Sequence, residues 1–151
     1  MAEVGCLKDV ACQNLEVSGS VSSKVNVVAL TLATTISTDQ SGTVFTLDSA
    51  GGAYDVTLPT VASASGCIFR FVCAENTPTA DITISSNGAN IVGVLHVQSD
   101  TNEDNLISVT GHTDVLFDTT ALIGDWIELI GNGTNYFVKG QGSVQGAFTI
   151  A

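Results

Sequence analysis

Residues 124–142 read GDWIELIGNGTNYFVKGQG, two alternating segments on either side of a glycine-rich turn. Along DWIELI and again along NYFVKG the side chains alternate as they do in strands, whose successive residues point to opposite faces. The GNGT between the two segments contains glycines and an asparagine, which tolerate positive φ angles. The stretch therefore predicts a β-hairpin. Trp126 and Tyr136, within its strands, are expected to pack in the core or in an interface.

Similar runs continue through the chain, and turn signals separate them at roughly 8–12-residue spacing. They are TVFTLD (43–48), YDVTLP (54–59), CIFRFVCA (67–74), ADITISS (80–86), IVGVLHV (91–97), NLISVT (105–110), DVLFDT (114–119) and a last short GAFTIA (146–151). In CIFRFVCA we expect the aromatic side, Phe69 and Phe71, to point inward. This pattern predicts an all-β domain, an antiparallel β-sandwich of jelly-roll-like type. No strict internal repeat is visible, which disfavours a propeller or a solenoid.

The first part of the chain has a different character. Residues 14–33 alternate loosely, with small polar residues between the apolar ones and no helix cap. We interpret residues 1–33 as an extended N-terminal arm and residues 34–151 as the sandwich domain. The arm has too few large side chains to form a core alone, so another chain is expected to bury it. The residues expected to contact a neighbouring subunit or another protein are Leu15, Val17, Val21, Val25 and Val27.

Charged residues are few, and most of them are acidic. Of the 151 residues 44% are hydrophobic and 13% are charged, and the formal net charge is −11. A field of this sign repels phosphate backbones, so nucleic acid is not an expected partner. No run approaches the roughly 20 apolar residues of a membrane span, and residues 1–14 lack the basic and apolar regions of a secretory signal. We expect a protein made in a cytoplasm, without a membrane partner.

Four cysteines raise the question of a disulfide or a metal site. Cys67 and Cys73 share one face of a predicted strand but lie about 20 Å apart along it, so they cannot pair within that strand. Neither pair has the short spacing of a zinc site. We expect Cys67 and Cys73 to be buried free thiols. Cys6 and Cys12, in the polar arm, are candidates for a disulfide, within one chain or between chains.

Residues suited to catalysis do not form a recognisable pattern. His96 and His112 stand alone, and the sequence contains neither a nucleophile elbow nor a phosphate-binding glycine loop. The acidic DTNED (100–104) offers oxygen ligands for calcium but lacks the glycine and the terminal glutamate of an EF-hand, so we interpret it as a solvated loop. The sequence predicts no enzyme, no cofactor and no metal. Its Ser, Thr, Gly and Val surfaces desolvate at low cost, which favours broad, permanent contacts.

Two segments resemble the capsid decoration (cement) proteins of tailed bacteriophages and related head-associated β proteins. They are TTISTDQSGTVFTLDSAGGAYDVTLPTVASASGCIFRFV (34–72) and GDWIELIGNGTNYFVKGQGSVQGAFTIA (124–151). The likeness lies in a Ser-Gly-x-x-Phe-x-Leu strand that leads to a Thr-Leu-Pro turn. It continues in a Gly-Asp-Trp strand that Gly-Thr joins to an aromatic strand ending in Val-x-Gly. Similar phrases also occur in phage head-fibre and tail-fibre modules.

The resemblance implies a β-rich homotrimer on the outer surface of a virion head. There it would contact the major capsid protein, bridge neighbouring subunits and stabilise the icosahedral shell. The family has no motif of reactive residues to carry over. The alternative is a phage fibre or receptor-binding module that recognises a host glycan, for which Trp126 and Tyr136 are the candidate aromatic platform.

Overall fold

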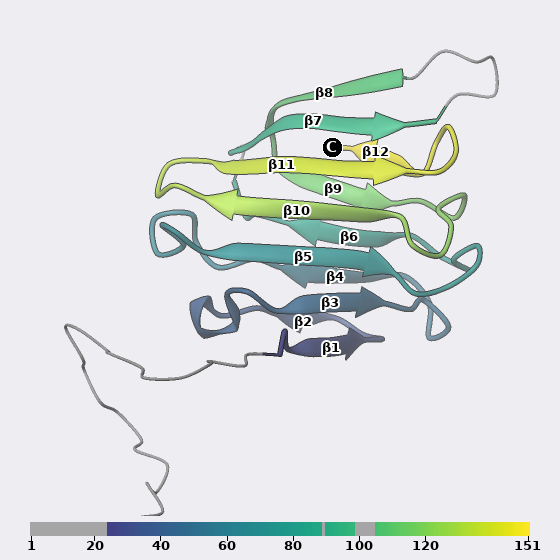
Figure 1. Ribbon diagram of the computed structural model, residues 1–151, viewed down its shortest axis with the longest axis horizontal. Helices are drawn as coiled ribbons and strands as arrows, with labels where there is room; N and C mark the ends of the chain where they lie inside the picture. The colour runs from purple at the N-terminus through teal and green to yellow at the C-terminus, as the bar shows by residue number, and fades with distance from the viewer. Residues whose placement is uncertain (1–23, 89, 99–104) are drawn as a thin grey trace, which may run out of the picture.

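The computed structural model describes residues 24–88, 90–98 and 105–151, which form an all-β structure (Figure 1). Its strands are β1 (Val27–Leu30), β2 (Thr34–Thr35), β3 (Val44–Leu47), β4 (Tyr54–Thr57), β5 (Ile68–Cys73), β6 (Ile82–Ser85), β7 (Ile91–Val97), β8 (Asn105–His112), β9 (Asp114–Phe117), β10 (Trp126–Gly131), β11 (Tyr136–Gly142) and β12 (Phe148–Ile150). One 3-10 turn, η1 (Thr38–Gln40), is the only helical element in these ranges. Every run that the sequence predicts as a strand is confirmed, from β3 to β12.

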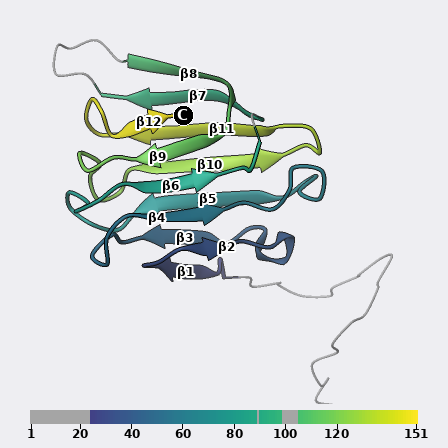
Figure 2. The same cartoon turned by 180° about the vertical axis from the view of Figure 1, so that it is seen from behind.

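Two sheets pack face to face, which confirms the predicted sandwich. The larger sheet has seven strands in the order β1-β3-β5-β10-β11-β7-β8, and the smaller has five in the order β12-β9-β6-β4-β2. The seven-stranded sheet is nearer the viewer in Figure 1, and the five-stranded sheet is nearer in Figure 2.

The predicted antiparallel arrangement is wrong for half of the strand pairs, because these pairs are parallel. Of the ten strand pairs in the described residues, five are parallel: β1 with β3, β3 with β5, β2 with β4, β4 with β6, and β11 with β7. From β1 to β6 the chain alternates between the two sheets, so each turn stacks on the one before it. The winding is right-handed, as is usual for connections between parallel strands (Figures 1 and 2). The first half is therefore a short, irregular solenoid, a winding that the sequence disfavoured.

The second half closes this coil with antiparallel strands. The β10–β11 hairpin lies between β5 and β7 in the seven-stranded sheet. β7 and β8 form a second antiparallel pair, and the chain then crosses to the five-stranded sheet as β9, which pairs with β6 and β12.

The core lies between the sheets and is built mainly of aliphatic and aromatic side chains. Phe45 and Phe71 stack with their ring centroids 5.3 Å apart, and Phe117 meets Phe148 edge-on at 5.1 Å. Phe69 and Phe71 are both fully buried, as predicted from the alternation of β5. Burial of each such side chain stabilises the fold by about 1.5–3 kcal/mol.

Cys67 and Cys73 belong to the same core. Both are buried free thiols, as expected. Burial raises the pKa of the Cys73 thiol above its ordinary value, with a smaller opposing effect from the backbone of Glu75. Cys6 and Cys12 lie outside the described residues, so their predicted disulfide remains a prediction.

The hairpin predicted from residues 124–142 is present, with β10 and β11 antiparallel. Its turn is held by Asn132, whose side-chain oxygen accepts hydrogen bonds from the N–H groups of Thr134 at 2.9 Å and Asn135 at 2.7 Å. Gly133 has a φ of +89°, a conformation that few side chains tolerate. Gly133 thus acts as the sequence predicts, whereas Asn132 holds the turn through its side chain and not through a positive φ.

The boundary between arm and domain lies earlier than residue 33. β1 (Val27–Leu30) is the edge strand of the seven-stranded sheet and pairs with β3 of the same chain. Leu30 is 5% exposed and belongs to the core. Residues 27–33 are therefore part of the sandwich, although the sequence assigned them to the arm.

Candidate functional site

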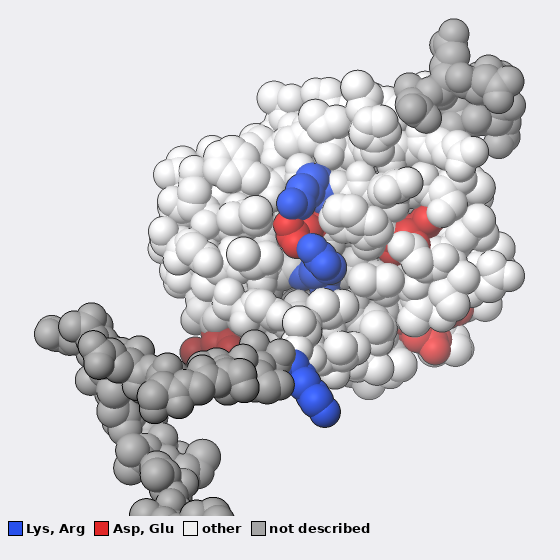
Figure 3. All heavy atoms as spheres, viewed as in Figure 1, with Lys and Arg blue, Asp and Glu red and all other residues white. Residues whose placement is uncertain are grey.

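The strongest candidate for a functional surface is the outer face of the seven-stranded sheet, which faces the viewer in Figure 3. Inward side chains such as Ile127 and Leu129 are fully buried, so the alternate residues of each strand point outward. Strand register arranges these outward residues in three rows across the sheet. The central row is Val27, Val44, Arg70, Glu128, Lys139, Val94 and Ser108. Beside it lie the rows Ile68, Ile130, Phe137, Val92 and Thr110, and Ala29, Thr46, Val72, Trp126, Gln141, His96 and Leu106.

A charged triad occupies the middle of this face. The Glu128 carboxylate pairs with the Arg70 guanidinium at 2.5 Å and with the Lys139 ammonium at 2.8 Å. Glu128 is only 7% exposed, whereas about half or more of the Arg70 and Lys139 side chains remains accessible. Arg70 also lies over the Trp126 ring, 5.5 Å from its centroid, within cation–π range.

These contacts determine the ionisation of Glu128. Its hydrogen bond from Lys139 is the largest influence and lowers the pKa of the carboxyl group below its ordinary value. Burial opposes this by raising the pKa, and Arg70 lowers it further. Glu128 is thus held as an anion between two cations, and the triad leaves an excess of one positive charge on the face.

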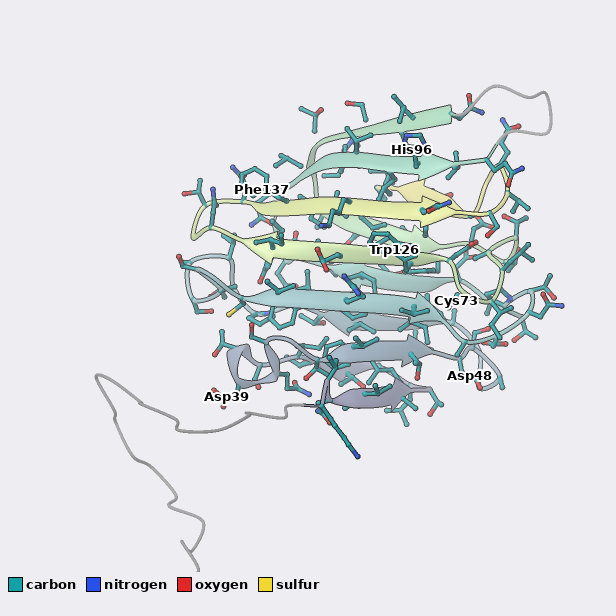
Figure 4. All side chains as sticks on the ribbon, in the orientation of Figure 1. Asp39, Asp48, Cys73, His96, Trp126 and Phe137 are labelled. Carbon is teal, nitrogen blue, oxygen red and sulfur yellow. The ribbon has the colours of Figure 1, made fainter. Side chains whose placement is uncertain are left out.

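Around the triad the face is apolar. Eight large hydrophobic residues are exposed in the described ranges, and six of them lie on this face or line a groove in it: Val25, Val27, Ile68, Val94, Leu106 and Phe137. Figure 4 shows Trp126 on β10 and Phe137 on β11, the central hairpin of the sheet. Contiguous apolar surface of this kind is typical of interaction sites.

A shallow groove of about 200 Å³ indents one side of the face. It is lined by Val25, Gly42, Thr43, Val44, Ile68, Arg70 and Glu128. The groove therefore joins the start of the described chain to two members of the triad.

The outer face of the five-stranded sheet has the opposite chemistry. Its strands pair so that Thr35, Thr57, Ser85 and Asp114 form one row, and Asp55, Thr83, Leu116 and Thr149 form the other. Hydroxyl and carboxylate groups predominate there, and none of these residues is among the exposed large hydrophobics. The two faces of the molecule are thus chemically distinct.

Two buried polar residues outside this face, Asp125 and Ser49, form hydrogen bonds with nearby loops. Asp125, 1% exposed, accepts hydrogen bonds from the Leu122 N–H at 2.9 Å and from the Ser143 N–H at 2.8 Å. The Ser49 hydroxyl accepts one from the Thr79 N–H at 2.8 Å. The Ser143 hydroxyl also donates a hydrogen bond to the Asp125 carboxylate at 2.5 Å. These contacts tie loops to the sandwich.

The two histidines considered and set aside as catalytic candidates lie on different strands. In the described part of the chain no three His, Cys, Asp or Glu residues are placed to hold a metal ion. His96 lies on the outer face on β7 (Figure 4), and His112 lies at the end of β8. The acidic loop at residues 100–104 lies outside the described ranges. No helix in those ranges is long and apolar enough to cross a membrane.

The residues predicted for the core or for contacts fall into four groups. Phe69, Phe71 and Tyr136 are fully buried core residues. Trp126 lies outside the core, on the outer face, so the part of its prediction that placed it in the core is wrong. Val25 and Val27 are 63% and 60% exposed and remain available for the predicted contact. Leu15, Val17 and Val21 lie in the part of the chain that the structure does not describe.

The aromatic platform of the glycan alternative is not assembled. Tyr136 is buried, and its hydroxyl donates a hydrogen bond to the Pro59 carbonyl at 2.7 Å. Tyr136 therefore cannot form a platform with Trp126 on the surface.

The sequence analysis did not predict the charged triad, although one of its pairs, Glu128 with Lys139, follows from the hairpin register. The turn at residues 132–135 fixes the hairpin register, which places Glu128 opposite Lys139. The third member, Arg70, joins them because β5 lies next to β10, a neighbour distant in sequence. Comparison of the chain with protein-family models gave no matching family, and comparison with curated protein sequences gave no matching protein.

Proposed function

We propose that the chain is a structural capsid decoration protein, which binds the outside of an icosahedral phage head as a trimer and stabilises it. The observation that carries this proposal is the outer face of the seven-stranded sheet. It gathers six of the eight exposed large hydrophobics of the described residues around one ion-paired charge cluster with a net charge of +1. Among the described residues, no three His, Cys, Asp or Glu gather there to hold a metal ion. We propose the capsid as the partner because residues 34–72 and 124–151 resemble decoration proteins.

The size of the face supports a contact with another protein. Six inter-strand spacings and strands of about six residues give an area on the order of 600 Å². A standard protein–protein interface buries about 800 Å² per partner, so the face alone would form most of one. Contacts from the arm would supply the remainder.

The chemistry of the face suits a permanent contact. Val, Ile, Thr and Phe side chains lose little hydration and little conformational entropy when covered. The triad costs little more, because Glu128 already has two partners and is already buried. Arg70 and Lys139 retain accessible donors for acidic groups on a shell. In this arrangement the hydroxyl-rich five-stranded sheet would face solvent.

The test is sedimentation of the protein with heads assembled from the major capsid protein of the same genome. We expect the wild-type chain to bind expanded heads and to leave unassembled capsid protein unbound. Phe137 lies between Ile130 and Val92 in its row, so Phe137→Glu buries a carboxylate without a directly opposite cation if the outer face is the contact. It is expected to weaken binding at least about tenfold. Thr149→Glu, on the opposite face, is the matched control and should bind as the wild type does.

Decorated heads are also expected to retain their DNA to a higher temperature than undecorated heads. Wild-type protein that does not bind expanded heads would overturn the proposal. Equal binding to assembled and unassembled capsid protein would do so as well.

A further inference from the structure

β8 forms the longest sheet edge that is left open within the described residues. It has eight residues and pairs only with β7, at one end of the seven-stranded sheet. The other three edge strands are shorter: β1 has four residues, β12 three and β2 two. An open edge of this length, with neither lysine nor proline, is a template for an added strand.

Hydrogen bonds between β7 and β11 show which way the backbone groups of β7 point. The Gln98 N–H donates to the Gly142 carbonyl at 3.0 Å, and the Tyr136 N–H donates to the Asn90 carbonyl at 2.9 Å. The even-numbered residues along β7 therefore face β11. Since backbone groups alternate in direction along a strand, the odd-numbered residues of β7 face β8.

The same alternation identifies the free groups of β8. Leu95 of β7 faces β8 and pairs with Ile107, so the odd-numbered residues of β8 bond back to β7. The even-numbered residues turn their N–H and C=O groups to the open edge: Leu106, Ser108 and Thr110. Regular pairing ends at Gly111, a bulge residue with a φ of +68°. The open edge thus accepts a strand of about six residues.

The inner side of β8 is incompletely covered. β8 projects beyond the five-stranded sheet in both views (Figures 1 and 2). The inward side chain of Ile107 is only partly buried, whereas its neighbour Leu95 on β7 is 0% exposed. An added strand with apolar residues on its inner side would complete the burial of Ile107.

Residues 15–21, LEVSGSV, have this pattern. Leu15, Val17 and Val21 share one side, and Glu16 and the two serines share the other. Placed along β8, the apolar side would face inward beside Ile107. The polar side would continue the outer face beside Leu106, Ser108 and Thr110.

The arm of the same molecule cannot reach this edge with residues 15–21. The Asn26 carbonyl accepts a hydrogen bond from the Val44 N–H of β3, which places Asn26 at the β1 edge of the sheet. β8 lies six strand spacings away, about 29 Å. The five residues from Val21 to Asn26 span at most about 18 Å. Only a second molecule can place its residues 15–21 on β8.

We infer that residues 15–21 of one molecule add as a strand to the open edge of β8 in the next molecule. The arm leaves at the β1 edge and binds at the β8 edge, so the contact is head-to-tail. Head-to-tail contacts close into a ring when the rotation between copies permits. This inference specifies the self-association within the proposed function and does not depend on capsid binding.

The first test is the mass of the oligomer in solution, measured by light scattering on the full chain. Ser108→Pro removes a free-edge N–H without removing a bond to β7, so it is expected to give folded monomers. Ser108→Ala keeps that N–H and should assemble as the wild type does. Leu106→Pro repeats the test at a second free-edge position. Deletion of residues 2–22 is also expected to give monomers.

The decisive test mixes the two defective variants. The Ser108→Pro chain has an intact arm, and the deleted chain has an intact β8 edge, so together they are expected to form a 1:1 dimer although neither assembles alone. Wild-type protein that is monomeric, or a deleted chain that keeps the wild-type mass, would overturn the inference. Absence of the mixed dimer would overturn it too. That absence is the result expected if two β8 edges pair with each other instead.

These outcomes separate the inference from the proposed function. Head-to-tail oligomers that do not bind heads would leave the inference standing and sink capsid decoration. Oligomers whose mass is unchanged by Ser108→Pro but which bind heads would overturn the inference and leave capsid decoration standing.

Discussion

Glu128 shows how a single carboxylate can partly neutralise the cations on an otherwise apolar face. It is the only acid among the strand residues of that face, and it lies between Arg70 and Lys139 on the two neighbouring strands. Both cations lie within ion-pair distance of the carboxylate, so only one of the two positive charges is left uncompensated when the face is covered. The triad therefore lies within the proposed contact surface, and its ion pairs reduce the charge that burial would desolvate.

Substitution of Glu128 should reveal the triad as a pH-dependent contribution to stability. Because the folded pKa lies below the unfolded value, the carboxylate stabilises the fold above about pH 4.3 and loses this effect as the pH falls through the folded pKa. Near neutral pH, Glu128→Gln is expected to lower the free energy of unfolding by about 1–2 kcal/mol. The difference from wild type should vanish in acid, as measured by urea unfolding at one protein concentration.

Asp39→Asn is the control for this experiment, since Asp39 is exposed and forms no ion pair within the described residues. It should change the free energy of unfolding by less than about 0.5 kcal/mol at any pH. An effect of Glu128→Gln that stayed constant down to acid pH would contradict the assignment.

The two tyrosines of the chain offer a second test at this scale. Burial raises the pKa of both Tyr54 and Tyr136 to about 12. Their hydroxyls donate to the carbonyls of Leu30 and Pro59, each at 2.7 Å. Folding stability should therefore decline as the pH rises from the unfolded value of about 10 towards 12, because the unfolded chain loses its phenolic protons first.

Absorbance at the tyrosinate band, followed together with circular dichroism, measures this titration. We expect no tyrosinate near pH 10 in the folded protein, and half-ionisation near that pH in concentrated guanidinium chloride. Ionisation of either tyrosine near pH 10 with an intact dichroism spectrum would show that it is not buried as described.

At the scale of the element, the position that most restricts the sheet is Gly93 in β7. Its φ is +149°, and a Cβ there would overlap the Val138 carbonyl of β11. Gly93→Ala is expected to cost about 3 kcal/mol or more, because it separates two paired strands. Thermal unfolding measures this cost.

Gly88→Ala is the matched control, since a Cβ at Gly88 would meet its nearest atom, the Asn90 side-chain nitrogen, at 3.4 Å. It should change stability by less than about 0.5 kcal/mol. Equal effects of the two substitutions would mean that β7 and β11 are not in the close contact described.

Elements of this fold follow from local sequence, but their arrangement does not. Each strand from β3 to β12 has its own alternation and turn residues, and the hairpin register follows from its Asn132–Gly133 turn. The parallel pairing of the strands from β1 to β6 has no such local signal in the sequence. Val27, Val44 and Arg70 occupy equivalent positions but are 17 and 26 residues apart, and Thr34, Val56 and Ile84 are 22 and 28 apart.

The site was predictable to a similar extent. Alternation alone separates Phe69 from Arg70 and Tyr136 from Phe137. It does not reveal that β5 and β10 are neighbours, which brings Arg70 to Glu128 and Trp126. The prediction for Trp126 was core or interface, and its core part was wrong because an aromatic residue in a strand is usually buried. Here Ile127 and Leu129 occupy the inward positions of β10.

On the scale of the whole molecule, the two outer faces differ in the way that the proposed decoration function requires. One is apolar, with two of the three basic residues of the described chain projecting from it, Arg70 and Lys139. The other presents hydroxyls and carboxylates. The described chain begins at the edge of the apolar face, where Val25 lines its groove. Partner contacts and the path of the arm are thus expected on the same side of the sandwich.

The central claim is that the outer face of the seven-stranded sheet is the contact face. A single-particle reconstruction of heads saturated with the protein tests it directly, because the two sheets differ in strand number and can be told apart. We expect Trp126, Phe137 and Val94 to lie against the shell or a neighbouring copy, with the five-stranded sheet exposed to solvent. A bound molecule with its seven-stranded sheet open to solvent would contradict the claim.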